Sequence, residues 1–475
     1  MGVAKNKERF RIPGEAANVV KTLKNKGFQA YLIGGCTRDL LLGRTPKDWD
    51  VTTDARPEEI IKIFPNTFYE NAYGTVGVVN EESPDESLRV IEVTPYRLEA
   101  TYSDYRRPDS VSFSDKLEDD LKRRDFTINA IALDIGGEED REFYEGRLVD
   151  PYKGQNDLRG ALVRTVGNPH ERFSEDALRM LRAIRIATEL GFMIDSDTEK
   201  AIEKYGNLLG NIAKERIRDE FVRILNSDRP MIGLELARRL GLLKYIAAEL
   251  EQGVGTAQNQ AHAYDVWEHS LRSLQHAADK KWPLEIRLAA LLHDIGKPAS
   301  RRWSDEKKDW TFYGHDVIGA KLAAKILSRL AFPKKTTETI SKLVRWHMFF
   351  SDTEVITLSA VRRLLANVGT EHIWDLMNLR ICDRIGTGRP KESPYRLRKY
   401  QSMIEEVMHD PVSVSMLRVN GADVISLTES SPGPKIGHIL HTLLGEVIED
   451  PKKNERSYLE KRVRELGKLS DQELE

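Results

Sequence analysis

The sequence predicts an α+β protein in which a small head of mixed sheet and helices is followed by an all-helical remainder. Short apolar runs of strand length are concentrated before residue 150, whereas helical periodicity dominates after residue 172. The 475 residues exceed what one ordinary hydrophobic core accommodates. We therefore expect four parts, which are a head, a helical neck, a histidine-containing helical region and a helical tail, over residues 1–158, 159–250, 251–390 and 391–475.

Composition limits the classes of function. The 73 Lys and Arg residues nearly balance the 75 Asp and Glu residues, so nucleic-acid binding would depend on a local basic surface. Cys36 and Cys382 are far apart and predict no disulfide framework, which fits a reducing, cytoplasmic location. The charged N-terminus lacks the apolar core of a signal peptide, and no stretch approaches the ~20 apolar residues of a membrane span.

Helices and strands are expected to alternate in the head. Pro13 and Gly14 precede a helical pattern that ends at Gly27, and this asymmetry is typical of helix starts and ends. Further along, a short helix is expected between Gly35 and Gly43. The other expected elements are helices at residues 16–26 and 58–64 and strands at residues 28–33, 49–52, 74–79 and 88–94.

The stretch YLIGGCTRDLLLGRTPKDWD predicts a nucleotide and metal site. Backbone N–H groups of a Gly-Gly turn that enters a helix suit phosphate, so Gly34, Gly35 and Arg38 are candidates to hold a nucleoside triphosphate. Asp48 and Asp50 open the next strand, where residues two apart point to the same face. Two adjacent carboxylates are costly without a cation between them, and paired hard oxygen ligands suit Mg²⁺.

Glu92 is a further candidate for this metal site. It is flanked by apolar residues in an expected strand, from which its side chain could face the two aspartates. A third carboxylate would then complete the metal ligands, and a solvated position is the alternative.

Several motifs of the head resemble one known family. GG-x-x-RD followed by D-x-D resembles the first motif of the class II tRNA nucleotidyltransferases and bacterial poly(A) polymerases, which belong to the polymerase-β-like nucleotidyltransferase superfamily. RRDFTINA resembles the second motif and implies that Arg124 contacts the nucleotide. LVDPYKGQNDL resembles the linker motif that closes the head. Residues 94–113 resemble the flexible loop that CCA-adding enzymes need for the final A, and this loop is complete here.

The neck begins with RFSEDALRMLRAIRIATELG, which predicts one helix with Ser174 as its N-cap and Gly191 after its end. Asp176 and Arg179 are three apart and therefore neighbours on its surface. Cytosine and adenine present an exocyclic amine beside an unprotonated ring nitrogen, whereas uracil and guanine present a carbonyl beside a ring N–H. Because a carboxylate only accepts and a guanidinium only donates hydrogen bonds, this pair suits C and A and mismatches U and G.

The sequence EDALR resembles the templating motif of the same family. The resemblance implies that Asp176 and Arg179 read the base and that Arg182 and Arg185 also contact the nucleotide. A solvated helix face with an ion pair is the alternative. KERIRDEFVRIL, at residues 214–225, resembles the next family helix and is expected to brace the neck.

Histidine and aspartate residues recur among the leucine-rich helical segments after residue 260, at His269, His293, Asp294, His315, His347 and Asp383. The series resembles the HD phosphohydrolase superfamily. The resemblance implies that one divalent metal is held by His269, His293, Asp294 and Asp383. It implies that a second metal or the phosphate lies at His315 and His347.

The chemistry of this region follows from its ligand types. Imidazole and carboxylate together suit Ni, Mn, Fe or Zn as well as Mg. Metal-activated water would hydrolyse a phosphoester, and we expect the region to trim or repair phosphate at RNA ends, such as a 2′,3′-cyclic phosphate. The alternative is a domain that is kept for its shape and has lost its metal.

The tail carries two candidate RNA contacts. GRPKESPYRLRKY is rich in cations and suits an RNA backbone, with a solvated helix face as the alternative. SPGPKIGHIL enters a helix whose first N–H groups could hold a phosphate or simply cap the helix. The tail resembles the C-terminal helical part of bacterial CCA-adding enzymes.

Together these features predict a tRNA nucleotidyltransferase that adds CCA to the tRNA 3′ end from CTP and ATP. Asp48 and Asp50 would hold Mg²⁺ at the head, with a further divalent metal at the HD residues. An enzyme that adds only the final A and a poly(A) polymerase are alternatives of the same class. An HD phosphohydrolase whose head only binds RNA is an alternative of another class.

Overall fold

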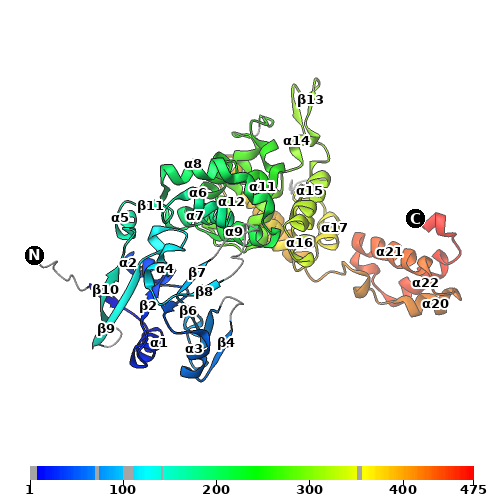
Figure 1. Ribbon diagram of the computed structural model, residues 1–475. Coiled ribbons are helices and arrows are strands. Elements are labelled where there is room, and N and C mark those ends of the chain that lie inside the picture. Colours follow the sequence, from blue (N-terminus) through cyan, green and yellow to red (C-terminus); the bar gives the residue numbers. More distant parts are fainter. Residues whose placement is uncertain are drawn as a thin grey trace, which may run out of the picture. The chain divides into compact units, whose positions relative to one another are not determined.

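Strands in the N-terminal part of the chain and helices in the rest confirm the predicted α+β class (Figure 1). The computed structural model describes residues 8–69, 74–99, 111–140, 143–260, 262–349 and 356–474. The chain divides into two compact units, Met1–Ala248 and Glu249–Glu475. The finer division into four parts remains a prediction. None of the helices among the described residues is long and apolar enough to cross a membrane.

An eight-stranded mixed sheet forms the head, with the strand order β1-β10-β9-β2-β3-β6-β5-β4. Strands β3 and β6 pair in parallel, and the other described neighbours pair antiparallel. The strands are Glu8–Arg11 (β1), Ala30–Ile33 (β2), Asp50–Thr53 (β3), Thr67–Tyr69 (β4), Val76–Val79 (β5), Val90–Pro95 (β6), Ala132–Asp140 (β9) and Phe143–Val149 (β10).

The four strands expected from the sequence correspond to β2, β3, β5 and β6, whereas β1, β4, β9 and β10 were not expected. Strand β9 has the sequence ALDIGGEED, and glycine and acidic residues are depleted in strands. Its pairing with β10 contains register shifts, which are typical of a β-bulge. The hairpin of β9 and β10 therefore carries little of the alternation from which strands are recognised.

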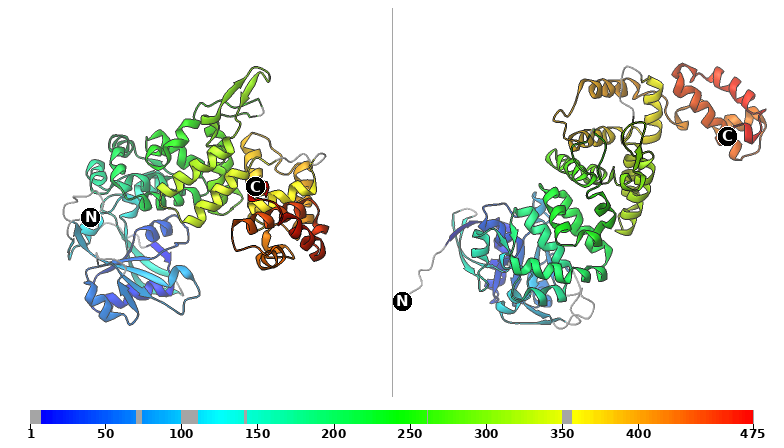
Figure 2. Two further views of the ribbon diagram at one scale, coloured as in Figure 1. Left: turned by 90° about the vertical axis from the view of Figure 1, so that its right-hand side faces the viewer. Right: turned by 90° about the horizontal axis from the view of Figure 1, so that it is seen from above.

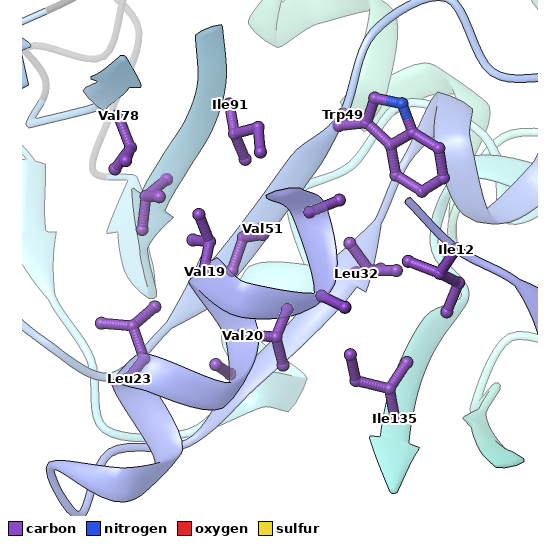
Figure 3. Packing of buried hydrophobic residues seen from close by; sticks show 14 of the residues in the cluster. Ile12, Val19, Val20, Leu23, Leu32, Trp49, Val51, Val78, Ile91 and Ile135 are labelled. Carbon is purple, nitrogen blue, oxygen red and sulfur yellow. The ribbon is translucent and has the colours of Figure 1, made fainter. Parts of the chain in front are cut away.

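The core of the head packs helix α1, Gly14–Asn25, against the sheet. The helix buries Ala16, Val19, Val20 and Leu23 at helical spacing. Figure 3 shows Val20 and Leu23 among strand residues such as Leu32 and Val51. This packing fixes the ends of β2 and β3, where the Gly-Gly turn and Asp50 are located. Helices α2, Gly35–Leu41, and α3, Pro57–Ile63, follow β2 and β3 along the chain.

The loop predicted at residues 94–113 begins and ends in regular structure. Strand β7, Arg97–Glu99, pairs with β8, Val111–Phe113. The rest of that loop, residues 100–110, lies outside the described residues. Helix α4, Leu117–Lys122, then leads into the second predicted motif.

Helices complete the first unit, together with the short parallel pair Leu162–Val163 (β11) and Met193–Ile194 (β12). The helix predicted from the N-cap Ser174 to Gly191 is interrupted, because the chain is extended at Asp176, with φ −138° and ψ 105°. Its predicted end before Gly191 is confirmed, but this helix starts at Leu178. Ser174 lies inside the first of the two resulting helices, which Asn168 caps. The N-cap of the second helix is Ala177, which has no side-chain hydrogen bond to the helix. The helices are Gly154–Arg159 (α5), Pro169–Glu175 (α6), Leu178–Leu190 (α7), Ser196–Tyr205 (α8), Lys214–Asn226 (α9), Pro230–Arg239 (α10) and Leu243–Ala247 (α11).

The second unit is helical apart from the hairpin of β13, Arg302–Ser304, and β14, Asp309–Thr311, which projects from the helices beside it (Figure 2). Both cysteines of the chain are buried and free, as expected. The helices of this unit are Val266–Asp279 (α12), Leu284–Leu292 (α13), Lys297–Ser300 (α14), His315–Arg329 (α15), Lys334–Trp346 (α16), Leu358–Val368 (α17), Ile373–Gly386 (α18), Tyr395–Val407 (α19), Gly421–Thr428 (α20), Pro434–Glu449 (α21), Arg456–Leu466 (α22) and Asp471–Leu474 (α23).

Candidate active sites of the two units

The turn between β2 and α2 brings the backbone against two charged side chains. Gly34 has a φ of +80°, and a Cβ atom there would lie 3.0 Å from Asp50 Oδ2 and 3.2 Å from Arg124 Nη1. A side chain at this position would therefore displace one of these groups. Gly35, the predicted nucleotide-binding residue, opens α2, and a Cβ there would meet Arg38 Nη2 at 3.8 Å. The close approach of the backbone to Asp50 and Arg124 therefore depends on Gly34 rather than on Gly35.

The predicted carboxylates gather beside this turn. Asp50 is the first residue of β3 and pairs with Glu92 of β6 in parallel register, so the two side chains share one face of the sheet. Asp48 does not lie in the strand, as had been expected, but in a bend two residues before it, where it is exposed. Asp48 and Glu92 line the same surface hollow.

The electrostatic surroundings of Asp50 favour a bound cation. Burial raises its pKa to about 6; Arg124 acts against this rise, and the neighbouring carboxylate of Asp48 adds to it. A divalent cation between the two aspartates would relieve both the burial of charge and the repulsion. The hard oxygen ligands present here therefore fit such an ion.

Arg124 is held in place by an acidic residue that the sequence analysis missed. Asp120 is completely buried, and its Oδ2 accepts hydrogen bonds from Arg124 Nη2 at 3.2 Å and from Thr52 Oγ1 at 3.2 Å. Arg123 pairs with its other oxygen at 2.6 Å. Burial acts to raise the pKa of Asp120, but the two arginines lower it overall. The i,i+4 spacing of Asp120 and Arg124 was the available sequence signal.

Two hydrogen bonds and an ion pair connect Arg38 to Arg182. Arg38 Nη1 donates to Asn129 Oδ1 at 3.0 Å, and Asn129 Nδ2 donates to Asp125 Oδ1 at 3.3 Å. Arg182 Nη2 pairs with Asp125 Oδ2 at 2.7 Å. Although burial opposes ionisation of Asp125, Arg182 and Arg179 lower its pKa to about 2. Asp125 therefore fixes α7 to the turn of the second motif.

The predicted cations of the head and neck converge on one carboxylate. Arg124, Arg182 and Arg38 each act to lower the pKa of Asp50, which places their charges close to it. Guanidinium groups around a metal-binding carboxylate suit the oxygens of a triphosphate. The structure thus brings together most of the residues that the motifs had singled out.

Asp176 and Arg179 do not form the ion pair expected from their spacing. Asp176 pairs with Arg216 of α9 at 2.8 Å, and its Oδ1 accepts a hydrogen bond from the N–H of Leu178 at 3.0 Å. Arg179 pairs with Glu175 at 2.7 Å and also donates to the carbonyl of Arg123 at 3.1 Å. The break in the helix at Asp176 separates the two side chains and gives each its own partner.

Arg185 lies within the packing of the neck. Its side chain is buried and pairs with Glu220 of α9 at 2.6 Å and with Glu189 at 2.9 Å. These contacts join α7 to α9. The predicted contact of Arg185 with a nucleotide has no support from this arrangement, and it stays a prediction.

In the second unit, the predicted HD residues meet at the ends and inner faces of helices. Asp294 lies centrally, with Oδ2 3.1 Å from His269 Nε2 and Oδ1 3.4 Å from His315 Nε2. The ligand atoms form two groups, each within 4.8 Å: His269, His293 and Asp383, and Asp294, His315 and His347.

Backbone carbonyls orient three of these imidazoles. In each case Nδ1 lies within hydrogen-bond distance of a carbonyl three residues earlier, which leaves Nε2 facing the carboxylates. The distances are 2.9 Å for His293 to Ala290, 2.7 Å for His315 to Phe312 and 2.6 Å for His347 to Val344.

The charges of this centre also fit a metal. Asp294 and Asp383 are buried, and burial acts to raise their pKa values, yet the cationic groups around them hold both pKa values well below the usual range. Burial acts to lower the pKa of His293, but the two carboxylates raise it to about 10. Two buried carboxylates beside four imidazoles are a ligand set that suits a divalent metal.

Two residues of the centre were missed by the sequence analysis. Lys297 Nζ lies 2.6 Å from Asp294 Oδ2, and the i,i+3 spacing of these residues was the available signal. His262 joins His269 and Asp294 in a third group of possible metal ligands. Burial, with help from Lys297, lowers the pKa of His262 to about 4. His262 precedes α12 in irregular structure, where no periodicity could have revealed it.

A pocket of about 900 Å³ adjoins the HD residues. Asp294, His315 and His347 form part of its lining. The hairpin β13–β14 and the chain between α18 and α19 contribute other parts, which include Trp310 and Arg389. The pocket therefore opens onto the centre formed by the HD residues.

Three family models match successive parts of the chain. The poly A polymerase head domain matches residues 30–164, the probable RNA and SrmB-binding site of polymerase A matches residues 191–253, and the HD domain matches residues 266–386.

Similar proteins cover nearly the whole chain. The CCA-adding enzyme of Geobacillus thermodenitrificans (strain NG80-2) is 32% identical over 93% of this chain and 94% of its own. That of Ligilactobacillus salivarius (strain UCC118) is 31% identical over 92% and 93%. The crystal structure of the Bacillus stearothermophilus CCA-adding enzyme in complex with CTP aligns with a TM-score of 0.69 and 29% identity, over 95% of this chain and 96% of that one. The Thermotoga maritima CCA-adding enzyme complexed with tRNA shares the fold, with a TM-score of 0.52 and 18% identity over 96% and 97%.

Proposed function

This chain belongs to the family of CCA-adding enzymes, and from that membership we propose how its residues add CCA to the 3′ end of tRNA from CTP and ATP. The protein is a nucleotidyltransferase. The observation that carries the assignment of the site is the convergence of Arg38, Arg124 and Arg182 on Asp50 beside the Gly34 turn.

The head would hold the nucleotide and the reacting oxygen. Asp48 and Asp50, with Glu92 beside them, would bind Mg²⁺, which when bound supplies charge neutralisation for the 3′-OH and the leaving pyrophosphate. Arg38 and Arg124 would hold the triphosphate by charge-assisted hydrogen bonds. The missing side chain at Gly34 lets the phosphates approach both groups.

The neck would choose the base. The carboxylate of Asp176 would accept a hydrogen bond from the exocyclic amine of C or A, and Arg179 would donate to the unprotonated ring nitrogen. Uracil and guanine would leave both groups unpaired, which is costly in a buried site. Arg182 and Arg185 would complete the nucleotide site, with Arg185 also bracing α7 against α9.

Three tRNA transcripts test this function, ending before CCA, after C and after CC. Each is incubated with Mg²⁺ and labelled CTP or ATP, and the products are sized on a gel. We expect all three to be extended to CCA and no further. Growth of the CC-ended transcript alone by one A would instead indicate an A-adding enzyme, and a long A ladder would indicate a poly(A) polymerase.

We propose a second activity for the HD residues, the hydrolysis of phosphate at RNA ends. Support comes from the paired groups of ligand atoms around Asp294 and from the adjoining pocket. Changing Asp48 and Asp50 to Ala should abolish nucleotide incorporation and spare phosphohydrolysis, and Asp294→Ala should do the reverse. Loss of both activities in a folded Asp294→Ala variant would contradict two separate sites.

A further inference from the structure

The pocket beside the HD residues is larger than one terminal phosphate requires. Its volume of about 900 Å³ lies near the upper end of the ~300–1,000 Å³ of small-ligand pockets. The metal-binding residues line only part of it. Other lining residues come from the hairpin β13–β14, from the last turns of α18 and from the chain that leads into α19, so the pocket extends well beyond the point of hydrolysis.

Cationic side chains that are not part of the metal-binding set line this outer region. Arg384 and Arg389 are both among the lining residues. Arg384 donates a hydrogen bond from Nε to the carbonyl of Lys391, and its two terminal nitrogens remain as candidates to bind a ligand. The nearby carboxylate of Asp309 accepts hydrogen bonds from the backbone N–H groups of Gln260 and Trp310. Because Lys307, Arg384 and Arg389 outnumber this one carboxylate in the outer lining, the region suits an anion.

Aromatic side chains lie in the same lining. Tyr313, which follows the hairpin, is 74% exposed, and Tyr395 at the start of α19 is 66% exposed. Trp310 of β14 is held in place, because the Arg301 guanidinium stacks 3.6 Å from its ring centroid and the Trp303 ring packs against its edge. Exposed aromatic rings beside arginines form the surfaces on which unpaired bases stack.

We infer that this pocket binds an RNA strand end of at least two nucleotides, with the terminal phosphate at the HD residues and the preceding phosphate at Arg384 and Arg389. Tyr313 and Tyr395 then stack on the bases. The inference rests on the proposed phosphohydrolase activity and names its substrate more closely. A mononucleotide would use only the inner half of the pocket.

The reaction at a 2′,3′-cyclic phosphate end is a balanced hydrolysis. The oxygen of water bonds to phosphorus, and one of the two phosphorus–oxygen bonds to the ribose breaks. The released ribose oxygen takes a proton, and the water supplies both the hydroxyl group and that proton. The product is a 2′- or 3′-phosphomonoester, and nothing is oxidised or reduced.

The test compares two substrates of the full-length protein with Mn²⁺ or Ni²⁺. One is adenosine 2′,3′-cyclic phosphate, and the other is the trinucleotide CCA that ends in the same cyclic phosphate. Because a second charge-assisted phosphate contact is available only to the trinucleotide, we expect its KM to be roughly tenfold lower. Arg389→Gln and Tyr395→Ala should each remove most of this preference. Lys335→Gln removes an exposed cation outside the pocket and should retain it.

Equal KM values for the two substrates, or a preference that survives Arg389→Gln, would overturn the inference. Hydrolysis of neither substrate would reject the phosphohydrolase activity itself. In that case the binding of a fluorescent CCA trinucleotide is measured by anisotropy. Weaker binding by Arg389→Gln than by wild type would still support the second phosphate contact, and equal affinity would overturn it.

Discussion

At the scale of single residues, the head depends on how closely charged groups approach the backbone. The carboxylate of Asp50 and the guanidinium of Arg124 both lie against Gly34, so close that a Cβ atom there would require one of them to shift. Asp120 forms an ion pair with Arg124, and Asp125 forms one with Arg182. The nucleotide site is therefore set by buried contacts as well as by the residues that would touch the substrate.

Gly34→Ala should strongly impair nucleotide incorporation. The new Cβ would displace Asp50 or Arg124, and the φ of +80° would strain the backbone as well. Because a displacement of about 1 Å at reacting groups costs on the order of 100-fold in rate, the smaller shift needed here, together with the backbone strain, should cost roughly tenfold. Single-turnover addition of CMP measures the loss. Gly35→Ala, whose Cβ has space, should lose much less, and equal losses in the two variants would contradict this explanation.

Arg216→Gln should weaken the choice of base. Arg216 orients the carboxylate of Asp176, and a hydrogen bond to a charged group contributes about 1.5–3 kcal/mol. The preference for CTP over UTP, measured as a ratio of kcat/KM values, should fall by roughly 10- to 100-fold. Arg218→Gln on the same helix is the control. An unchanged ratio in Arg216→Gln would show that Asp176 needs no such support.

Residues with local signatures could be predicted from the sequence, whereas those that act across the fold could not. Gly34, Asp50 and Arg124 stand in compact motifs. Arg216 reaches Asp176 across 40 positions, and no spacing rule connects them. Arg179 pairs with Glu175, the neighbour of the predicted partner Asp176. The sequence alone could not decide between these two acids, because the choice depends on the backbone conformation between α6 and α7.

At the scale of elements, the break between α6 and α7 shows where periodicity fails. The segment contains neither Pro nor Gly, so its apolar spacing predicted one helix. Asp176 leaves the helical conformation because its side chain accepts the N–H of Leu178, which offers the backbone an alternative to the helical bond. The break also turns Asp176 toward α9, where Arg216 is located.

Arg185 and Glu220 should behave as a brace between α7 and α9. Removal of one partner from a buried ion pair typically costs about 3–5 kcal/mol, so Arg185→Met should lower the free energy of unfolding. Replacement of both residues by Met should restore much of it. Chemical denaturation followed by circular dichroism measures the stability. A stable double variant that has lost CMP addition would instead favour contact of Arg185 with the nucleotide.

Asp125 should contribute stability that depends on pH. Its pKa in the fold is about 2, below the ordinary 3.8, so its contribution is present above about pH 4 and is lost as pH falls toward 2. The shift corresponds to on the order of 2 kcal/mol. Urea denaturation measures the free energy of unfolding at pH 5 and at pH 3. The fall in this free energy between the two pH values should be smaller for Asp125→Asn than for wild type. Equal differences would mean that Arg182 does not stabilise this carboxylate.

At the scale of the whole molecule, each unit contains a complete candidate site. Residues from the head and neck form the nucleotide site within residues 1–248, and all the HD residues lie within residues 249–475. Separate cores in the two units allow separate unfolding, because each unit keeps its own buried contacts. A ligand of one site should therefore stabilise one unit only.

Differential scanning calorimetry should resolve this independence. CTP with Mg²⁺ binds the folded first unit, and a ligand at 100 times its Kd adds about 2.7 kcal/mol of stability, so one transition should move to higher temperature. Mn²⁺ alone should raise the other transition, since it neutralises the buried carboxylates of Asp294 and Asp383. Mn²⁺ that binds at Asp48 and Asp50 would move only the first transition. Asp294→Ala should abolish the Mn²⁺ shift of the second transition and leave the CTP response in place. A single transition that both ligands shift together in wild type and variant would show that the two units unfold as one.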